Sequence, residues 1–316
     1  MAARFDPTEI TLAEVPGSDL KKLVLGDLTF IDSSGIRWTA PEGTLTDGAS
    51  VPRLALSISD GRFDAAFLKA AVVHDAYCQS DNMSRNPPFQ SRSWRATHRM
   101  FYEACRAGGT PWKRARILFA AVWWGGPRWG DPVAQAAQAP PDLARIGLSA
   151  TKHWIETDEP DLDAIEADVG NREIQVVQIH ALQMQAIRAM VQGNSDSALS
   201  SLLAADTDIA SGLAAAPNDL MYLNLQAYQH KNWAMLRPDD RDDRLALAET
   251  LFQNVIASEP NDPGALNGLG SVAMLRGRLA EAKTMIRKAL DIEPGYAAAL
   301  HDLQQIEDYE HRIGTD

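Results

Sequence analysis

The sequence predicts an α+β N-terminal domain, made of a small antiparallel sheet and three helices, followed by an all-α solenoid of helical repeats. Three observations lead to this prediction. Short apolar runs separated by turn residues fill positions 1–60, three helical segments follow them, and a helical pattern with a 34-residue period occupies the last part of the chain. We therefore expect domains at 1–130 and 173–316, joined by a linker at 131–172.

The bulk composition is typical of a globular protein with room for two domains. The chain has 316 residues, of which 45% are hydrophobic and 23% charged. An apolar run of about 18 residues, which a membrane span requires, is absent from the sequence, and the first residues lack the apolar core of a signal peptide. We therefore expect a cytoplasmic protein. Its two cysteines, Cys78 and Cys105, belong to no CxxC motif, which argues against a disulfide scaffold.

Charge divides the chain into two parts of opposite character. Residues 1–150 contain 17 Lys and Arg against 15 Asp and Glu, whereas residues 151–316 contain 13 against 27, a net charge of −14. Within the first part, residues 85–116 form a basic run with eight basic side chains and one acid, Glu103. This asymmetry supports a division into two modules.

Residues 1–60 are expected to form strands and turns. An apolar stretch at 23–32 is interrupted by Gly26-Asp27, and a turn at 32–35 leads into a strand at 36–39. Three helices are predicted next, at 63–79, 91–107 and 111–124. Thr110 is the expected N-cap of the third helix, with Pro111 at its first position.

Two short stretches of the N-terminal part contain the polar groups of a site. Residues 46–53 read TDGASVPR, an acid, a glycine and a hydroxyl ended by a proline, which predicts a tight polar turn. The doublet His74-Asp75 follows in the first predicted helix. At helical spacing His74 points toward the core, and Asp75 lies about 100° further round, at the margin of that face.

These stretches carry a resemblance to a known family. The pattern W-x-A-P-x-G-T-x-T-D-G-A-S-V-P-R begins at Trp38 and is followed by a helix with the His-Asp doublet. It resembles an uncharacterised domain family of bacteria and their phages, over roughly residues 20–130. The resemblance implies no settled activity.

Two functions follow from these residues. In the first, Asp47, His74, Asp75 and Ser50 form a hydrolytic site, because a histidine can act as a general base and a carboxylate can orient it or hold a cation. The doublet is similar to the helix of secreted phospholipases, although their disulfides and glycine-rich calcium loop are absent from this sequence. In the second, Asp47 closes a turn, His74 is a hydrogen-bonded core residue, and the chain is a non-enzymatic adaptor or a phage-associated structural protein.

A metal site is a further interpretation, although the sequence specifies no cofactor. Packing the first two helices could bring together two imidazoles and two thiols, from His74, His98, Cys78 and Cys105. The alternative is that both helix faces are core, with cysteine as a small buried hydrophobe. A phosphohydrolase of the HD type would need a histidine before the doublet, and His74 is the first histidine in the chain.

The stretch between the two predicted domains is polar. Residues 131–141 are rich in Pro, Ala and Gln, and residues 156–168 are acidic. We expect a linker here, with one short helix at about 142–155.

The C-terminal part resembles tetratricopeptide repeats. Small residues stand where two helices would touch, and a proline ends the second helix. The residues that carry this pattern are Ala265, Gly268, Gly270, Ala273, Gly277, Ala282, Ile286, Ala289 and Pro294, with Ala248, Phe252, Val255 and Pro260 one period earlier. Leu225 and Ala227 suit the first helix of that earlier copy, with an insertion near 238–243. A degenerate copy is expected at 176–217 and a cap helix at 296–313.

A solenoid of this kind implies a groove that holds a peptide or a partner helix. Its net charge favours a basic partner, unless the acids merely keep the array soluble, and it disfavours nucleic acid. The basic run at 85–116, with interleaved aromatics, could instead bind nucleic acid, or be a solvated helix face. The tryptophan-rich segment 123–129 could line a ligand pocket or seal a small core.

Overall fold

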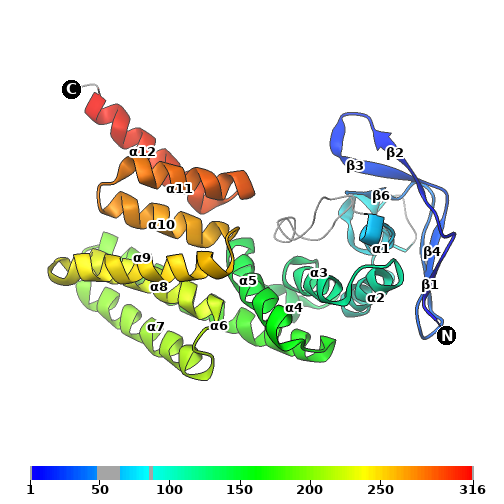
Figure 1. The fold of residues 1–316 in the computed structure, drawn as a ribbon, viewed down its shortest axis with the longest axis horizontal. Helices are drawn as coiled ribbons and strands as arrows, with labels where there is room; N and C mark the ends of the chain where they lie inside the picture. Colours follow the sequence, from blue (N-terminus) through cyan, green and yellow to red (C-terminus); the bar gives the residue numbers. More distant parts are fainter. Residues whose placement is uncertain (1, 48–64, 85–87, 315–316) are drawn as a thin grey trace. The chain divides into compact units, whose positions relative to one another are not determined.

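The computed structural model describes residues 2–47, 65–84 and 88–314 of the chain. The chain forms two compact units. The N-terminal unit comprises Met1–Gln138 and Trp154–Val169, and the helical unit comprises Ala139–His153 and Gly170–Asp316. Strands lie in the first unit and helices make up the second (Figure 1). The predicted fold class, antiparallel strands followed by helices and then an all-α repeat region, is confirmed.

Two three-stranded antiparallel sheets begin the N-terminal unit. One has the order β1 (Arg4–Asp6), β4 (Leu28–Ile31), β5 (Arg37–Ala40), and the other β2 (Thr11–Val15), β3 (Ser18–Leu25), β6 (Leu45–Thr46). Gly26 has a φ of 101° and separates β3 from β4, at the predicted interruption. Gly35, with a φ of 84°, closes the predicted turn between β4 and β5, where its N–H donates to the Asp32 carbonyl at 2.9 Å.

Three helices follow these sheets, close to their predicted ranges. They are α1 (Ala65–Cys78), α2 (Trp94–Ala107) and α3 (Trp112–Gly125), with the short helix η2 (Ser80–Asn82) after α1. Helix α1 contacts β4, β5, β6 and α2, so side chains are buried all round its second half. The expected cap of α3 differs: the hydroxyl of Thr110 donates to the Ala66 carbonyl at 2.9 Å, and Pro111 is the boundary residue of the helix.

Residues 131–172, expected to be a linker, are largely helical. They contain α4 (Pro132–Ala137), α5 (Pro141–Asp158) and the start of α6 (Leu162–Val191), and the last two helices contribute to both units. Several acids of this stretch form ion pairs. Within the N-terminal unit, Arg99 bonds to Asp163 and Glu166, and Lys113 lies 3.5 Å from Glu159. Because basic side chains neutralise these acids, the acidic sequence can form packed helices.

The helical unit consists of antiparallel helices stacked in sequence order (Figure 1). After α6 they are α7 (Ser195–Ala215), α8 (Leu220–Leu236), η3 (Pro238–Asp240), α9 (Arg241–Ser258), α10 (Pro263–Leu275), α11 (Leu279–Ile292) and α12 (Ala297–Gly314). The predicted insertion near 238–243 contains η3 and the first turn of α9. The apolar positions of the 34-residue pattern form its core, including Ala248, Phe252, Ala282 and Ile286, all fully buried.

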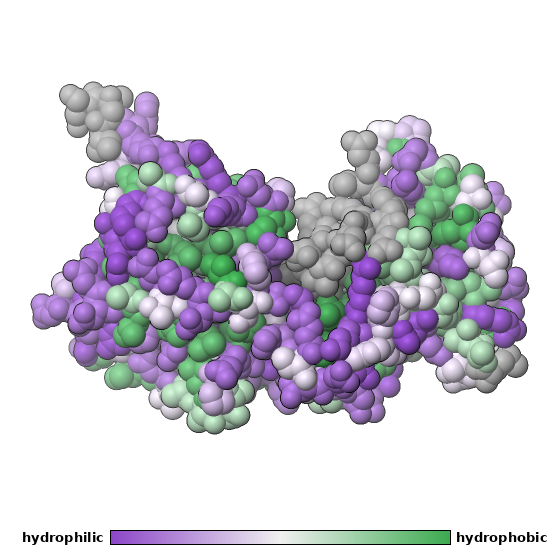
Figure 2. All heavy atoms as spheres, viewed as in Figure 1, coloured by the Kyte–Doolittle hydropathy of each residue, from purple (hydrophilic) through white to green (hydrophobic). Residues whose placement is uncertain are grey.

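The surface of this unit is largely polar. Hydrophilic residues predominate over its face in Figure 2, with hydrophobic residues in smaller groups between them. Throughout the described part of the chain, none of the helices combines the length and the hydropathy that a membrane span requires.

Replacing glycine by alanine should lower the stability of the protein where two helices are closely packed and raise it where the glycine has open space around it. A Cβ atom added to Gly268 of α10 would lie 2.3 Å from the Phe252 ring of α9, whereas one added to Gly170 of α6 meets nothing within 4 Å. We expect Gly268→Ala to lower the free energy of unfolding by about 1–3 kcal/mol through overpacking. Gly170→Ala should raise it by about 0.5–1 kcal/mol, because alanine favours the helix. Urea denaturation followed by circular dichroism measures both, and equal effects would contradict this packing.

Candidate functional sites

The His74-Asp75 doublet lies at the C-terminal end of α1, inside the N-terminal unit. His74 is 1% exposed and Asp75 is fully buried. The sequence predicted the imidazole in the core and the carboxylate only at its margin. The difference arises because β6 and η2 pack over the side of α1 that carries Asp75. Both members of the doublet are therefore shielded by the described residues around them.

The Asp75 carboxylate is held on one oxygen. Thr46 of β6 donates its hydroxyl hydrogen to Asp75 Oδ2, with the oxygens 2.6 Å apart. Asn82 of η2 fixes the same region, since its Nδ2 donates to the backbone carbonyls of Asp75 and Leu45, and its Oδ1 accepts from the Leu45 N–H at 2.8 Å. Asp75 Oδ1 is buried and has no hydrogen-bond partner among the described residues.

His74 contacts three other polar groups. Its Nε2 is 2.9 Å from Nδ1 of His98 on α2, its Nδ1 is 3.3 Å from the Cys78 sulfur, and the same Nδ1 is 3.9 Å from Asp75 Oδ1. His98 is fully buried, and the rings of Trp94, Trp123 and Trp129 lie within 6.2 Å of it. The pKa of His98 is held well below its usual 6.5, first by burial and then by His74 and Arg128.

The predicted site residues are brought together in part. His74, Asp75 and Cys78 form the one cluster of three candidate metal ligands in the described ranges, with ligand atoms within 4.8 Å of one another, and His98 adjoins it. Cys105 is outside this cluster. Its thiol interacts with Thr110 and Arg114, and burial raises its pKa. Asp47 follows β6, is half-buried and makes contacts of its own.

Ser50, the hydroxyl of the predicted hydrolytic site, lies outside the described residues together with the rest of 48–64. The hydrolytic group Asp47, Ser50, His74 and Asp75 therefore stays a prediction.

Sequence reasoning missed the two residues that bind Asp75. Thr46 is the first residue of the predicted turn at 46–53, so its hydroxyl lay within the motif although no role was predicted for it. Asn82 had no signal, because it follows the helix in a stretch without periodicity. Trp123 and Trp129 contact the His98 ring, and Trp124 is also buried, as expected if this segment seals a small core.

The basic run at 85–116 is partly neutralised inside its own unit. Arg95 is 2.7 Å from Asp131, Arg99 bonds to two acids of α6, and Arg116 donates to the Glu159 carbonyl at 3.0 Å. The acids raise the pKa of Arg99, Glu166 more than Asp163. Cations engaged in this way are less available for phosphate.

The helical unit contains a pocket of about 190 Å³ between its helices. Its walls come from α5, α6, α8, α10 and α12, and the lining is mixed apolar and polar, with Asp142, His180, Gln183, Tyr228, Lys231, Asn232, Asn267, Ser271, Tyr296 and Asp302 among its residues. Because the lining helices α6, α8, α10 and α12 alternate with α7, α9 and α11 along the stack, the pocket lies on one face of the repeats.

The acidic groups that line this pocket have polar partners, whereas its lysine has none among the described residues. Asp302 accepts from Asn267 Nδ2 at 3.1 Å and from the Ser271 hydroxyl at 2.6 Å, and Asp142 is 3.6 Å from Arg145. Lys231 makes no hydrogen bond or ion pair with any described residue, although its ammonium lies 5.3 Å from the Tyr228 ring centre. Burial lowers the pKa of Lys231, and Asp302 opposes the shift more weakly.

One wall of the pocket is α5, in the segment predicted as a linker. Arg145 of α5 bonds to Glu293, and its guanidinium lies 4.6 Å from the Tyr296 ring centre. Lys152 donates to Glu259 at 2.6 Å. The Ser149 hydroxyl donates to Asp262 at 2.8 Å. These bonds attach α5 to the loops that precede α10 and α12.

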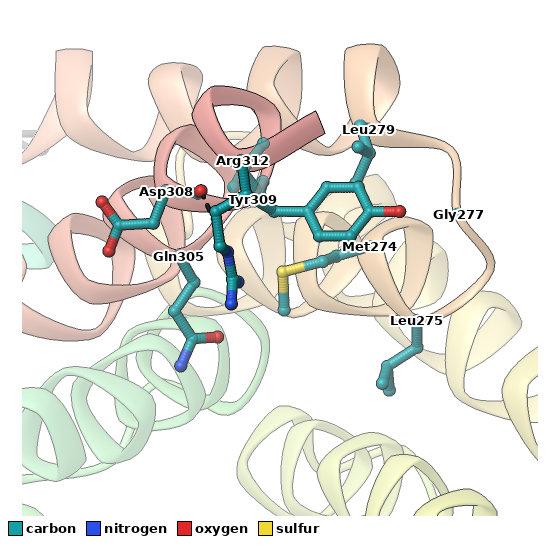
Figure 3. Close-up of a pocket in the computed structure, with 9 residues that line it drawn as sticks. Met274, Leu275, Gly277, Leu279, Gln305, Asp308, Tyr309 and Arg312 are labelled. Carbon is teal, nitrogen blue, oxygen red and sulfur yellow. Dashed lines mark hydrogen bonds between the residues drawn. The ribbon is translucent and has the colours of Figure 1, made fainter. Parts of the chain in front are cut away.

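A second pocket of the helical unit, of about 560 Å³, lies between α12 and the turn that joins α10 to α11. Figure 3 shows Gln305, Tyr309 and Arg312 of α12 opposite Met274 and Leu279. Its polar groups partly satisfy one another, since Arg312 Nε donates to the Asp308 carbonyl at 3.3 Å. This pocket has a larger volume than the first and is lined by fewer buried polar groups.

Comparison with known families identifies both parts of the chain. Residues 23–122 match the family described as "Protein of unknown function (DUF1353)", and residues 241–306 match the tetratricopeptide repeat. Both resemblances predicted from the sequence are thereby confirmed.

Two curated relatives are uncharacterized proteins of Sinorhizobium fredii. The chain is 36% identical to y4iH over 38% of this chain and 46% of the relative. It is 41% identical to y4jT over 33% of this chain and 28% of the relative, so less than half of each relative is matched. Among solved structures, the NMR structure of the first TPR domain of human RPAP3 is similar, with 18% identity, a TM-score of 0.29, and coverage of 44% of this chain and 97% of that chain.

The Thr46–Asp75 bond should stabilise the N-terminal unit more than a neighbouring threonine bond does. A hydrogen bond to a carboxylate contributes about 1.5–3 kcal/mol, so we expect Thr46→Val to lower the free energy of unfolding by about 2 kcal/mol. Thr44→Val is the control and should cost about 1 kcal/mol, since the Thr44 hydroxyl donates to the neutral carbonyl of Pro41 at 2.7 Å. Urea denaturation followed by tryptophan fluorescence reports this unit, because Trp233 is the one tryptophan of the helical unit. A Thr46 variant as stable as the wild type would contradict the assignment.

Proposed function

We propose that this protein is a non-enzymatic adaptor that holds a segment of a partner protein in the 190 Å³ pocket of its helical unit. The single observation that carries the proposal is the Lys231 ammonium, which faces this pocket without a hydrogen bond or ion pair from the described residues. Tetratricopeptide repeats generally present such a face to peptides. Lys231 therefore supplies a binding group in the place where this fold binds.

The neutral polar groups of the pocket favour a peptide as the bound segment. Asn232 and Asn267 are each 2% exposed, and the Oδ1 atom of each lacks a hydrogen-bond donor in the described part of the chain. Buried acceptors without donors are costly, so they favour a ligand that carries N–H groups. A peptide backbone carries one such group at every residue except proline.

The charged groups of the pocket favour a carboxylate on that segment. Asp302 and Asp142 already have partners, so a cation of the ligand would have to compete for them. Lys231 has none among described residues, and a carboxylate would offset the cost of burying its ammonium. The net charge of −14 in residues 151–316 favours basic residues elsewhere in the partner, outside the pocket.

Burial of the doublet supports the non-enzymatic function for the N-terminal unit. A general base must come within about 3 Å of the proton that it removes, either directly or through one water. His74 is 1% exposed, and both of its ring nitrogens already face polar groups of the protein. The matched family is described as one of unknown function, and neither relative has a described activity. We therefore favour the adaptor over the hydrolase.

A charge-removing variant tests the proposed pocket. Peptides that bind the full chain are first selected from a synthetic array of random sequences. For each peptide with Asp, Glu or a free C-terminal carboxylate, the array also contains a neutral counterpart with Asn, Gln or a C-terminal amide. We expect Lys231→Met to weaken the selected peptides about 10- to 100-fold, because it removes a charge-assisted bond. Stability should be unchanged or higher, since burial disfavours this ammonium.

The control for this experiment is Lys288→Met, because Lys288 is exposed on α11 and does not line the pocket. It should bind the selected peptides as the wild type does in calorimetric titrations. Equal binding by Lys231→Met and the wild type, or an array with no preference for carboxylates, would reject the proposal.

A further inference from the structure

The cluster at the end of α1 has the composition and spacing of a metal site. It offers an imidazole nitrogen, a thiol sulfur and a carboxylate oxygen from His74, Cys78 and Asp75, all buried. His74 Nδ1 is 3.3 Å from the sulfur and 3.9 Å from Asp75 Oδ1. A tetrahedral zinc ion, with bonds of about 2.0–2.3 Å, separates its ligand atoms by about 3.3–3.6 Å. These two separations are close to that range, and because the whole cluster extends to 4.8 Å, the ligand atoms that lie farthest apart would have to move closer to bind zinc.

The second observation is the unsatisfied carboxylate oxygen. Asp75 is fully buried, its Oδ2 is bonded to Thr46, and its Oδ1 has no partner among the residues described. Such an oxygen is expensive to bury unless a donor or a cation compensates it. This oxygen is 3.9 Å from His74 Nδ1, and a carboxylate oxygen of Asp75 lies within 4.8 Å of both the His74 nitrogen and the Cys78 sulfur. A cation bound there would satisfy all three groups together.

We propose that His74 through Nδ1, Cys78 through its sulfur and Asp75 through Oδ1 bind a divalent transition-metal ion, with zinc as the best fit. Nitrogen, sulfur and oxygen donors in tetrahedral geometry are the ligands that zinc takes in proteins. On binding, the Cys78 thiol releases its proton to solvent and the thiolate bonds to the ion. Three protein ligands leave the fourth position for water or another donor.

The residues around the cluster fit this assignment. With its Nδ1 on the metal, His74 carries its proton on Nε2 and donates it to His98 Nδ1, at the observed 2.9 Å. Metal-bound histidines commonly use their second nitrogen in this way, which fixes the orientation of the ring. Thr46 fixes the orientation of the Asp75 carboxylate in the same way, by donating a hydrogen bond to Oδ2. His98 and Thr46 are thus positioning residues for the ligands.

Cobalt binding tests the site, because a cobalt–thiolate bond gives a charge-transfer band in the near ultraviolet. Full-length protein is stripped with a chelator and titrated with Co²⁺. We expect one equivalent to bind, to give this band, and to be displaced by Zn²⁺. The two cysteines of the chain provide a matched pair, since Cys105 is as deeply buried but lies outside the cluster. Cys78→Ser should abolish the band, and Cys105→Ser should keep it.

A second variant separates metal binding from folding. Asp75→Asn retains an oxygen that can accept from Thr46 but loses the negative charge. We expect it to keep the circular dichroism spectrum of the wild type and to bind Zn²⁺ at least tenfold more weakly. Failure of the wild type to bind Co²⁺ or Zn²⁺, survival of the band in Cys78→Ser, its loss in a folded Cys105→Ser, or unchanged Zn²⁺ affinity in Asp75→Asn would each overturn the proposal.

Discussion

The hydrogen bond from Thr46 to the buried Asp75 carboxylate is the contact on which the N-terminal unit depends. A carboxylate without exposure must find its partners inside the protein. Thr46 meets this need at Oδ2, and Asn82 holds the backbone carbonyl of Asp75 instead of its carboxylate. Together these two residues attach β6 and η2 to the end of α1. The same packing places His74 against His98 and removes the doublet from the surface. The polar residues that resemble a catalytic group thus act first as internal connections between elements.

The charged side chains of the helical unit fall into two groups, those that are paired and one that is not. At its loops, charges are paired within the unit: Lys152 with Glu259, and Arg145 with Glu293. In the pocket Lys231 remains without such a partner among the described residues. Paired buried charges fix a structure, whereas an unpaired charge in a pocket costs stability that a ligand can restore. This contrast supports the proposal that the pocket binds the partner, while the paired charges stabilise the loops.

The sequence predicted the repeats well because their contacts recur with a fixed period. Positions such as Ala248 and Ala282, one period apart, are both fully buried. Helical spacing also allowed His74, His98, Cys78 and Cys105 to meet; the first three lie together, whereas Cys105 lies outside the cluster. Burial of Asp75 was not predictable, because it depends on β6, which lies far away in the chain. The stretch 131–172, expected to be a linker with one short helix, is largely helical. Its helices could not be foreseen in full, because the partners of its charged residues, such as Arg99 and Glu259, are distant in sequence.

Binding of the partner protein in the 190 Å³ pocket can be measured in cells. Photo-crosslinking in the source cells tests it most directly, with p-benzoylphenylalanine placed at Met184, which lines the pocket, or at Met235, which is 44% exposed and does not line it. If the partner occupies the pocket, position 184 should give partner adducts that a selected carboxylate-containing peptide suppresses, and position 235 should give none. Adducts from position 235 with none from position 184 would contradict it.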